Sequence, residues 1–315
     1  MGRNFLDIVE KEKTWDIVDA TKLKKFMECP RSYFYEYILG WRPEQPSIHL
    51  EFGKAWHYAM EHLLLHGYSA ESVKEAWDLL NNHYRIFFTP EMDSMFAPKT
   101  PGNALSALIG YAKTYEQQDR NDKVKYTEIA GTVSISGDKV LHFRMDSIIE
   151  NDKGMLSREH KTAGTLSRQW RDQWSLSIQV GTYLHVLYCL FPTEEIWGVE
   201  INGTIFNKTK TQYERIPCRR SKGMMEDWLT TVNYWYEQLE FEKQSLFDDD
   251  ANESDKVMVA FPKNPCACTN YFGCPYFDFC MAWANPLQYI EYVPQGMKVE
   301  HWNPMEEESK VVFTV

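Results

Sequence analysis

The sequence predicts a mixed α/β (α+β) fold in which helices precede a sheet. Three segments in the N-terminal part have apolar residues at helical spacing: 51–66, 70–88 and 103–118. The next three segments suit the strands of a meander: 126–136, 139–150 and 155–162. A helix, two strands and another helix are then expected over 172–190, 195–206, 212–217 and 221–243. This order is typical of a central sheet covered by helices.

The second strand of the meander has the clearest alternation. Its apolar residues share one face: Leu141, Phe143, Met145 and Ile149. Asp146 lies on the opposite face. In the third strand, the period of two places Glu159 and Lys161 on one face and His160 on the other.

The N-terminal segment 20–39 is also expected to be helical. Thr21 is a plausible N-cap, and Pro30 interrupts the segment, so that two short helices are possible. We expect a single domain over residues 1–315, with three parts: a helical part over about 20–120, a catalytic core over about 126–245 and a cysteine segment at 264–282.

Composition and charge are those of a folded, acidic protein. Hydrophobic residues make up 43% and aromatic residues 15%, which excludes a disordered chain. The net charge of −11 argues against a protein that coats nucleic acid, but segments 205–223 and 158–171 carry local charges of +5 and +3. The sequence has no apolar run of roughly 18 residues and no signal-peptide pattern. We therefore expect a cytoplasmic protein without a membrane span.

Asp146 and the Glu159-x-Lys161 triplet form the first candidate site. Two carboxylates on adjacent strands can converge on one divalent cation, and hard oxygen ligands suit Mg²⁺ or Mn²⁺. Lys161 projects from the same strand face as Glu159, where its ammonium could orient a water or offset charge in a transition state. Alone, such a triplet is more often a cross-strand ion pair on a surface.

Two helices carry further candidates at a spacing of four, which places them on one helical stripe. His57 lies four residues after Gly53 and four before Glu61. Its imidazole could join the same cation, and Gly53 would permit a close approach of the backbone. Gln179 and Tyr183 could hydrogen-bond a phosphate or a water. Alone, His57 also suits a core histidine, and Gln179 with Tyr183 an ordinary surface pair.

Five of the seven cysteines suggest a metal site. Four lie within fifteen residues: Cys266, Cys268, Cys274 and Cys280. Cys29 lies far upstream. In an intracellular protein, such a cluster binds metal more often than it forms disulfides. Four thiolates could hold a [4Fe–4S] cluster or zinc, although the spacing is not the paired C-x2-C of zinc ribbons. Cys268 gives an even spacing with Cys274 and Cys280, which leaves Cys266 as a spare.

Taken in this order, the motifs resemble the PD-(D/E)XK nuclease superfamily. Within it they resemble the RecB-like exonuclease branch with an iron–sulfur cluster, which includes the AddB and RecB nuclease domains, CRISPR-associated RecB-like nucleases and phage exonucleases. The matching pieces span residues 29 to 280: Cys29-Pro30-Arg31, Gly53 to Glu61, Arg144-Met145-Asp146, Glu159 to Thr162, Gln179 to Tyr183 and the C-terminal cysteines. Each motif is loose, but the ordered set is specific.

The resemblance implies a restriction-endonuclease-like core with a mixed central sheet. It also implies roles for the candidate residues. Asp146, Glu159, His57 and the carbonyl of His160 would bind Mg²⁺ or Mn²⁺, and Lys161 would be the catalytic lysine. The active site would also be lined by Gln179 and Tyr183. An iron–sulfur cluster, favoured over zinc, would tie the C-terminal segment to the N-terminal helix through Cys29, Cys268, Cys274 and Cys280.

The function implied is that of a metal-dependent DNA exonuclease, acting on single-stranded DNA or DNA ends in recombination, repair or replication. Trp41, Trp56 and Trp170 could stack on bases, and segment 205–223 could contact the DNA backbone. The chain has no G-x-x-x-x-G-K-[S/T] motif, so that a helicase or recombination partner could supply unwinding. A phage-encoded nuclease would act in the host cytoplasm. Alternatives on the same fold are a catalytically silent DNA-binding or scaffold module, an RNase and an endonuclease.

Overall fold

The computed structural model describes residues 13–247, 256–270, 273–305 and 311–314. The chain forms two compact units, each assembled from segments that are distant in the sequence. Unit 1 comprises Met1–Gln45, Thr132–Phe143 and Glu226–Glu308. Unit 2 comprises Pro46–Gly131, Arg144–Met225 and Ser309–Val315. Among the helices of the described ranges, none is long and apolar enough to cross a membrane.

A mixed six-stranded sheet has the strand order β6-β5-β4-β3-β2-β8. Its strands are β2 (Lys123–Ser136), β3 (Lys139–Asn151), β4 (Gly154–Ala163), β5 (Ile196–Phe206), β6 (Thr211–Cys218) and β8 (Val311–Thr314). β3 is antiparallel to β4, β4 is parallel to β5, and β5 is antiparallel to β6. The expected meander and the expected mixed sheet are both present, while β8 was not predicted.

β4 and β5 are the most buried strands of unit 2. Residues 155–160 of β4 are all buried, as are residues 198–206 of β5. Parallel strands buried on both faces need an apolar covering on each side, and helices supply it. In the register of this pair, His160 lies beside Asn202 and Lys161 beside Gly203. The candidate residues are therefore attached to the most firmly packed strands of their unit.

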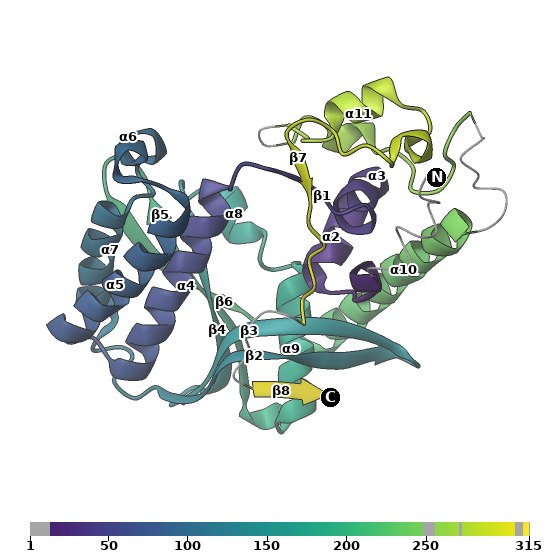
Figure 1. The fold of residues 1–315 in the computed structure, drawn as a ribbon. Coiled ribbons are helices and arrows are strands. Elements are labelled where there is room, and N and C mark those ends of the chain that lie inside the picture. Colours follow the sequence, from purple (N-terminus) through teal and green to yellow (C-terminus); the bar gives the residue numbers. More distant parts are fainter. Residues whose placement is uncertain (1–12, 248–255, 271–272, 306–310, 315) are drawn as a thin grey trace. The chain divides into compact units, whose positions relative to one another are not determined.

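Three helices of unit 2 lie side by side, namely α4 (Ile48–His66), α5 (Ala70–Phe87) and α7 (Pro101–Tyr115) (Figure 1). Their buried faces share one apolar core, into which Phe206 of β5 inserts between Phe52 and Trp56 at ring-centroid distances of 4.9 and 5.1 Å. Each helix begins at a hydroxyl N-cap: Ser47, Ser69 and Thr100. α4 consequently begins three residues before the predicted start.

The single helix expected over 172–190 is wrong, because two helices occupy this region: α8 (Arg168–Asp172) and α9 (Ile178–Leu190). The Ser177 hydroxyl accepts the N–H of Val180 at 3.5 Å and caps α9. The Arg220 guanidinium donates to the carbonyl of Ser177 at 2.8 Å. These local bonds hold the chain at Ser177 outside a helix, so that α9 starts there. α9 then packs on β4 and β5.

Unit 1 contains α2 (Ala20–Glu28), α3 (Pro30–Tyr33), the π-helical turn η2 (Phe34–Ile38), most of α10 (Lys222–Phe247), and α11 (Phe277–Ala282). A second, two-stranded sheet pairs β1 (Trp41–Pro43) with β7 (Met297–Val299). Pro30 stands at the first position of α3, where its missing N–H costs nothing, and it separates α2 from α3 as expected. Aromatic rings fill the interior: Tyr35 stacks against Trp41 and Tyr276 at 5.6 and 5.3 Å.

The remaining short elements are η1 (Lys13–Asp16), η3 (Pro90–Met92), α6 (Asp93–Phe96), η4 (Thr193–Glu195), η5 (Pro265–Ala267) and η6 (Pro286–Tyr289).

Candidate active site

The three residues of the first candidate site converge in unit 2. Lys161 Nζ donates to Glu159 Oε1 at 2.7 Å, which places both side chains on one face of β4 as predicted. Asp146 of β3 lies beside them, because its Oδ2 accepts the backbone N–H of His160 at 2.7 Å. His57 of α4 completes the group, with 3.0 Å between His57 Nδ1 and Asp146 Oδ1. One helix and two strands thus deliver an imidazole, two carboxylates and an ammonium to one place.

Gln179 and Tyr183 of α9 join the same cluster. The Gln179 amide donates to Glu159 Oε1 at 3.1 Å and to the Tyr183 hydroxyl at 2.8 Å. The Tyr183 hydroxyl donates in turn to the carbonyl of Arg144, two residues before Asp146. The helical spacing of four therefore has the consequence expected from the sequence, and α9 ties β3 to β4 at the cluster.

The charges of the cluster depend on one another. Burial opposes ionisation of Asp146, but His57 and Lys161 hold the pKa of this carboxyl well below its usual range. Burial likewise opposes protonation of His57, yet the nearby Asp146 raises the pKa of the imidazole. For Glu159, burial and the neighbouring Asp146 both raise the pKa. Asp146 is therefore the firmly ionised carboxylate.

Lys161 keeps its proton in this setting. Burial disfavours the ammonium, but Glu159 and Asp146 raise the pKa of Lys161 above its usual value. The lysine therefore enters the site as a cationic hydrogen-bond donor and not as a base.

One buried oxygen of the cluster suits a divalent cation. Glu159 Oε2 is buried and accepts no hydrogen bond from the described residues. A cation would satisfy such a carboxylate oxygen, and Asp146 and His57 offer further ligands of the appropriate type. Across the described ranges, no three His, Cys, Asp or Glu side chains converge closely enough to hold a metal as they stand. Instead, His57 and Lys161 bond the carboxylate oxygens that face them.

A comparison with sequence models of protein families finds that the model of the PD-(D/E)XK nuclease superfamily matches residues 18–281. The chain belongs to the PD-(D/E)XK nuclease superfamily. The matched region contains every residue of the cluster, and the resemblance found in the sequence is confirmed at this level. A search of curated proteins finds no match. One similar solved structure, titled "Crystal structure of SSO0001", is 13% identical, with 73% of this chain and 82% of that chain covered and a TM-score of 0.31.

The cysteines of the second candidate site lie in unit 1: Cys29, Cys266, Cys268, Cys274 and Cys280. All seven cysteines are free thiols. Burial raises the pKa of Cys274, and the nearby Cys29 and Cys268 thiols add to the shift. Burial likewise raises the pKa of Cys280, which has Cys29 and Cys274 as neighbours. Cys266 is exposed. Cysteine sulfur is a donor that suits zinc and iron–sulfur clusters. In the described part of the chain, however, no three of these side chains converge closely enough to hold a metal as they stand.

Hydrogen bonds position these cysteines as well. The Asn264 N–H donates to Cys29 Sγ at 3.4 Å, and the Asn264 amide donates to the carbonyl of Glu28 at 2.7 Å. The Cys274 N–H donates to the carbonyl of Cys268 at 3.1 Å. Asn264 therefore joins the segment that carries Cys268 to the end of α2.

Several sequence-based expectations about the surroundings of the site are wrong. Trp41 and Trp56 are 2% and 0% exposed and belong to the cores of their units, so that neither can stack on a base. Trp170 is half-buried and remains accessible. Gly53 makes no close approach to the sheet, because no described atom apart from neighbouring residues of its own helix lies within 4 Å of the place where its Cβ would be.

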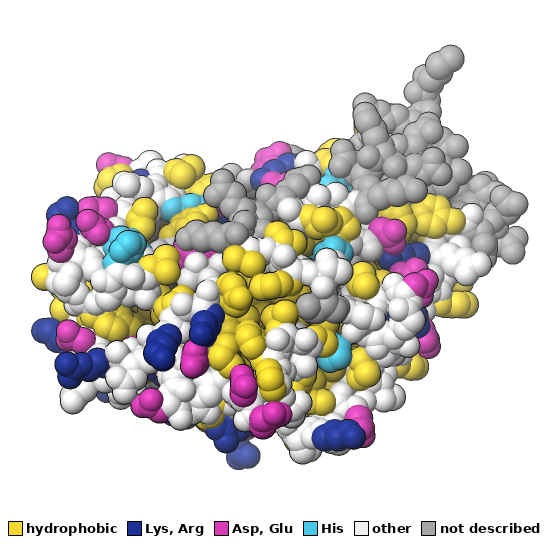
Figure 2. Space-filling view, turned by 90° about the horizontal axis from the view of Figure 1, so that it is seen from below, with side chains coloured by type: hydrophobic (Ala, Val, Ile, Leu, Met, Phe, Trp, Pro, Cys, Tyr) yellow, Lys and Arg dark blue, Asp and Glu magenta, His cyan; other side chains and the backbone are white. Residues whose placement is uncertain are grey.

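The basic segments are also less available than their charge suggests. In segment 205–223, Arg215 and Arg220 are engaged inside unit 2, Arg215 with Asp119 and Arg220 with backbone carbonyls. In segment 158–171, Arg158 is buried and Arg171 pairs with Glu214. On the face of the molecule that Figure 2 displays, basic side chains lie among acidic ones. The net charges of segments 205–223 and 158–171 therefore overestimate how much basic surface these segments present.

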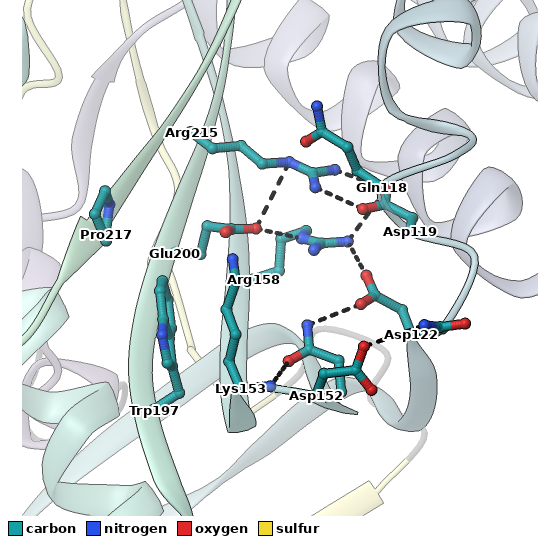
Figure 3. Close-up of a pocket in the computed structure, with 12 residues that line it drawn as sticks. Gln118, Asp119, Asp122, Asp152, Lys153, Arg158, Trp197, Glu200, Arg215 and Pro217 are labelled. Carbon is teal, nitrogen blue, oxygen red and sulfur yellow. Dashed lines mark hydrogen bonds and ion pairs between the residues drawn. The ribbon is translucent and has the colours of Figure 1, made fainter.

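A buried ionic network that no sequence motif signals lies on the opposite face of β4 from Glu159 and Lys161. Figure 3 shows Arg158 of β4 between three carboxylates, Asp119, Asp122 and Glu200, in the wall of a cavity of about 350 Å³. Arg158 lies 2.8 Å from both Glu200 Oε1 and Asp122 Oδ2, and 3.4 Å from Asp119 Oδ2. Arg215 donates to both carboxylate oxygens of Asp119, to Oδ1 at 2.5 Å and to Oδ2 at 2.7 Å. No motif links these residues, since they come from four separate segments.

Asn202 is a second residue that no sequence motif signals, and it links the ionic network of Arg158 and Arg215 to His160 beside the candidate active site. Asn202 of β5 is buried, and its amide donates to Tyr111 Oη at 2.7 Å and lies 2.8 Å from His160 Nδ1. Arg215 Nε donates to Asn202 Oδ1 at 3.3 Å. Burial lowers the pKa of His160 to about 3, so that the imidazole is neutral and Nδ1 accepts from Asn202. The parallel register of β4 and β5 is the signal that could have paired them.

Proposed function

We propose that this protein is a metal-dependent DNA exonuclease of the RecB-like branch, which hydrolyses phosphodiester bonds in single-stranded DNA or at DNA ends. The observation that carries the proposal is the buried cluster of Asp146, Glu159 and Lys161 with His57. Membership of the nuclease superfamily supports the same reaction class.

Asp146, Glu159 and His57 would hold the divalent cation, with the carbonyl of His160 as a further ligand. Carboxylate oxygens suit Mg²⁺, and the added imidazole nitrogen suits Mn²⁺. When bound, the cation would act as a Lewis acid on the scissile phosphate.

The chain's own residues would orient the reactants. Lys161 is a protonated donor beside Glu159, so that its N–H groups can orient an attacking water and offset the negative charge that develops on the phosphate. Gln179 steadies Glu159, and Tyr183 steadies the backbone of β3 at Arg144. Burial of the cluster strengthens each of these interactions.

A pair of indoles would receive the DNA strand. Trp170 and Trp174 meet edge to face, with ring centroids 5.7 Å apart. Lys161 Nζ lies 5.9 Å from the centroid of the Trp174 ring. Gly203 makes room for Trp170, because a Cβ at this position would overlap the indole. Half-buried indoles beside the catalytic lysine suit base stacking on single strands.

The cysteines Cys29, Cys268, Cys274 and Cys280 would bind a [4Fe–4S] cluster with a structural role, and zinc is the alternative. Such a centre would tie the C-terminal segment to the N-terminal helix and close a loop of more than two hundred residues. We further propose one functional domain over residues 1–315, located in the cytoplasm and acting in DNA recombination, repair or replication with a helicase or recombination partner.

End-labelled DNA would test the proposal. Purified protein would be incubated with single-stranded DNA labelled at the 5′ or 3′ end, in Mn²⁺, Mg²⁺ or EDTA, beside the variants Asp146→Asn and Asp152→Asn. Asp152 is an exposed aspartate in the turn after β3, where it accepts a bond from Asn121, and it serves as the matched control. We expect metal-dependent cleavage by wild type and Asp152→Asn, and a rate at least about 10³-fold lower for Asp146→Asn.

The outcomes separate the alternatives. The label that disappears first gives the polarity, and internal products would indicate an endonuclease. Preferred cleavage of RNA of the same sequence would indicate an RNase. DNA that is bound but left intact under both metals would overturn the nuclease proposal in favour of a DNA-binding module.

A further inference from the structure

Arg144 and Glu128 form an ion pair next to the candidate active site that the proposed chemistry does not use. Arg144 precedes Asp146 by two residues on β3, so that both side chains lie on the same face of the strand. Its Nε and Nη2 atoms donate to Glu128 Oε2 at 3.1 and 2.6 Å. The Arg144 side chain is 33% exposed, whereas that of Glu128 is 14% exposed. The cation therefore faces solvent beside the cluster, and the carboxylate lies beneath it.

The backbone at Glu128 has an unusual conformation. Glu128 has a φ of +47° within β2, in the left-handed region that side-chain-bearing residues seldom adopt. Burial and the nearby Asp146 also raise the pKa of Glu128. A strained, buried carboxylate next to another carboxylate persists only where its surroundings hold it, and the Arg144 guanidinium is its ion-pair partner.

Arg144 is also held from the backbone side. The Arg144 carbonyl accepts a hydrogen bond from the Tyr183 hydroxyl. That hydroxyl accepts one from the Gln179 amide, and the same amide also donates to Glu159. The two-residue step along a strand places Arg144 about 6.6 Å from Asp146, measured between backbones. A guanidinium fixed at this offset can reach a phosphate that flanks the one at Asp146.

We propose that Arg144 binds a backbone phosphate of the substrate strand adjacent to the scissile phosphate, and that Glu128 holds the guanidinium in position. This inference rests on the proposed function. A planar guanidinium has five N–H donors and matches the oxygens of a phosphate in pairs, and pairing with Glu128 through Nε and Nη2 fixes its plane. By contrast, Arg158 and Arg215 are enclosed by carboxylates and cannot take this role.

The test separates binding from catalysis. Anisotropy of fluorescent single-stranded DNA would be followed in EDTA at several salt concentrations, for wild type, Arg144→Gln, Arg144→Lys and Glu128→Gln. Arg168→Gln is the matched control, because Arg168 is 93% exposed and bonds only its helical neighbour Asp172 among the described residues. The values of KM and kcat with Mn²⁺ would be measured for the same proteins. Thermal unfolding would verify that each variant folds.

We expect Arg144→Gln to weaken DNA binding about tenfold and to raise KM by a similar factor, with kcat within about threefold of wild type. The slope of log affinity against log salt should fall by about 0.7, the value for one phosphate of a single strand. Arg144→Lys should recover part of the loss. Glu128→Gln should weaken binding about threefold, although removing a negative charge alone would strengthen it.

Unchanged binding and KM in Arg144→Gln, or tighter binding in Glu128→Gln, would overturn the inference. If Arg144→Gln does not fold, Arg144→Lys and Glu128→Gln still decide between these outcomes. If the wild type cuts DNA and Arg144→Gln has an unchanged KM, this inference alone is contradicted. A wild type that binds DNA through Arg144 without cutting it would contradict the proposed function alone.

Discussion

The candidate active site in unit 2 and the cysteine group in unit 1 differ in the partners of their side chains. In unit 2, each carboxylate bonds a cationic group of the protein: Asp146 bonds His57, and Glu159 bonds Lys161. In unit 1, Cys29 Sγ accepts a backbone N–H from Asn264, and burial keeps the pKa of Cys274 above its usual value. Asp146 and Glu159 have cationic partners in the protein, whereas burial disfavours the thiolate form of Cys274 and Cys280.

The two sites therefore differ in how much a bound metal would contribute to the stability of the fold. Asp146 Oδ1 and Glu159 Oε1 bond His57 and Lys161 in the absence of a metal, so that metal binding would rearrange bonds that already exist as well as satisfy Glu159 Oε2. A metal at the cysteines would bind them as thiolates and would add its binding free energy to the stability of unit 1. We therefore expect the first site to depend on a metal for chemistry and the second for stability.

The largest stability effect is expected in unit 2, from the replacement of Arg158 by alanine. The Arg158 side chain is 3% exposed and pairs with Glu200 and Asp122 at 2.8 Å. Arg158→Ala leaves buried carboxylates without their cation and should lower the free energy of unfolding by about 3–5 kcal/mol. Urea denaturation would measure the loss, with Arg168→Ala as the exposed control. Metal content at the cysteines should stay unchanged, and a loss below about 1 kcal/mol would contradict the role assigned to this network.

The complementary change is made in unit 1. Cys268→Ser should lower the iron or zinc content of purified protein and reduce the free energy of unfolding by at least about 2 kcal/mol, because a ligand of the stabilising metal is lost. Cys266→Ser, at the exposed neighbouring cysteine, should change neither. Elemental analysis and absorbance near 400 nm after anaerobic purification would distinguish iron–sulfur from zinc. Equal metal content in the two variants would contradict the assignment of Cys268.

The smallest effect concerns Lys99 of unit 2, which, unlike Lys161, has no carboxylate partner among the residues that the structure describes. Lys99 is buried near the Phe52 ring, and burial lowers the pKa of Lys99 to about 8. Between pH 8 and the usual lysine value of 10.5, the unfolded chain binds more protons than the folded chain, so that stability rises with pH. Lys99→Met should lack this rise of about 1–3 kcal/mol.

Paired urea titrations of wild type and Lys99→Met at pH 7.5 and 10 would isolate this contribution, because other groups titrate alike in both proteins. Parallel stability profiles would indicate that the folded chain leaves Lys99 with its ordinary pKa.

The sequence predicted most of the fold and the cluster because both follow from local periodicity. The alternation in β3 and β4 places Asp146, Glu159 and Lys161 on known strand faces, and the spacing of four pairs Gln179 with Tyr183. Meander strands are neighbours in the sheet, so that short-range patterns already determine which side chains meet.

Features that depend on distant partners were not predictable in the same way. The buried state of Trp41 and Trp56 is decided by rings from other segments, such as Tyr35 and Phe206. The pairing of Arg144 with Glu128 depends on a local left-handed turn in β2 that no residue type signals. The division of the 172–190 region depends on the bond from Arg220 to Ser177, which lies 43 residues away in the sequence.

We propose above all that unit 2 holds a catalytic site in which Lys161 acts on the phosphate. The most direct test is the single-turnover rate of DNA cleavage with Mn²⁺ for Lys161→Ala, beside Lys153→Ala. Lys153 is an exposed lysine that lies over the Trp197 ring and is the matched control. We expect a rate at least about 10³-fold lower for Lys161→Ala and an unchanged rate for Lys153→Ala. A Lys161→Ala rate within threefold of wild type would contradict the catalytic role of Lys161.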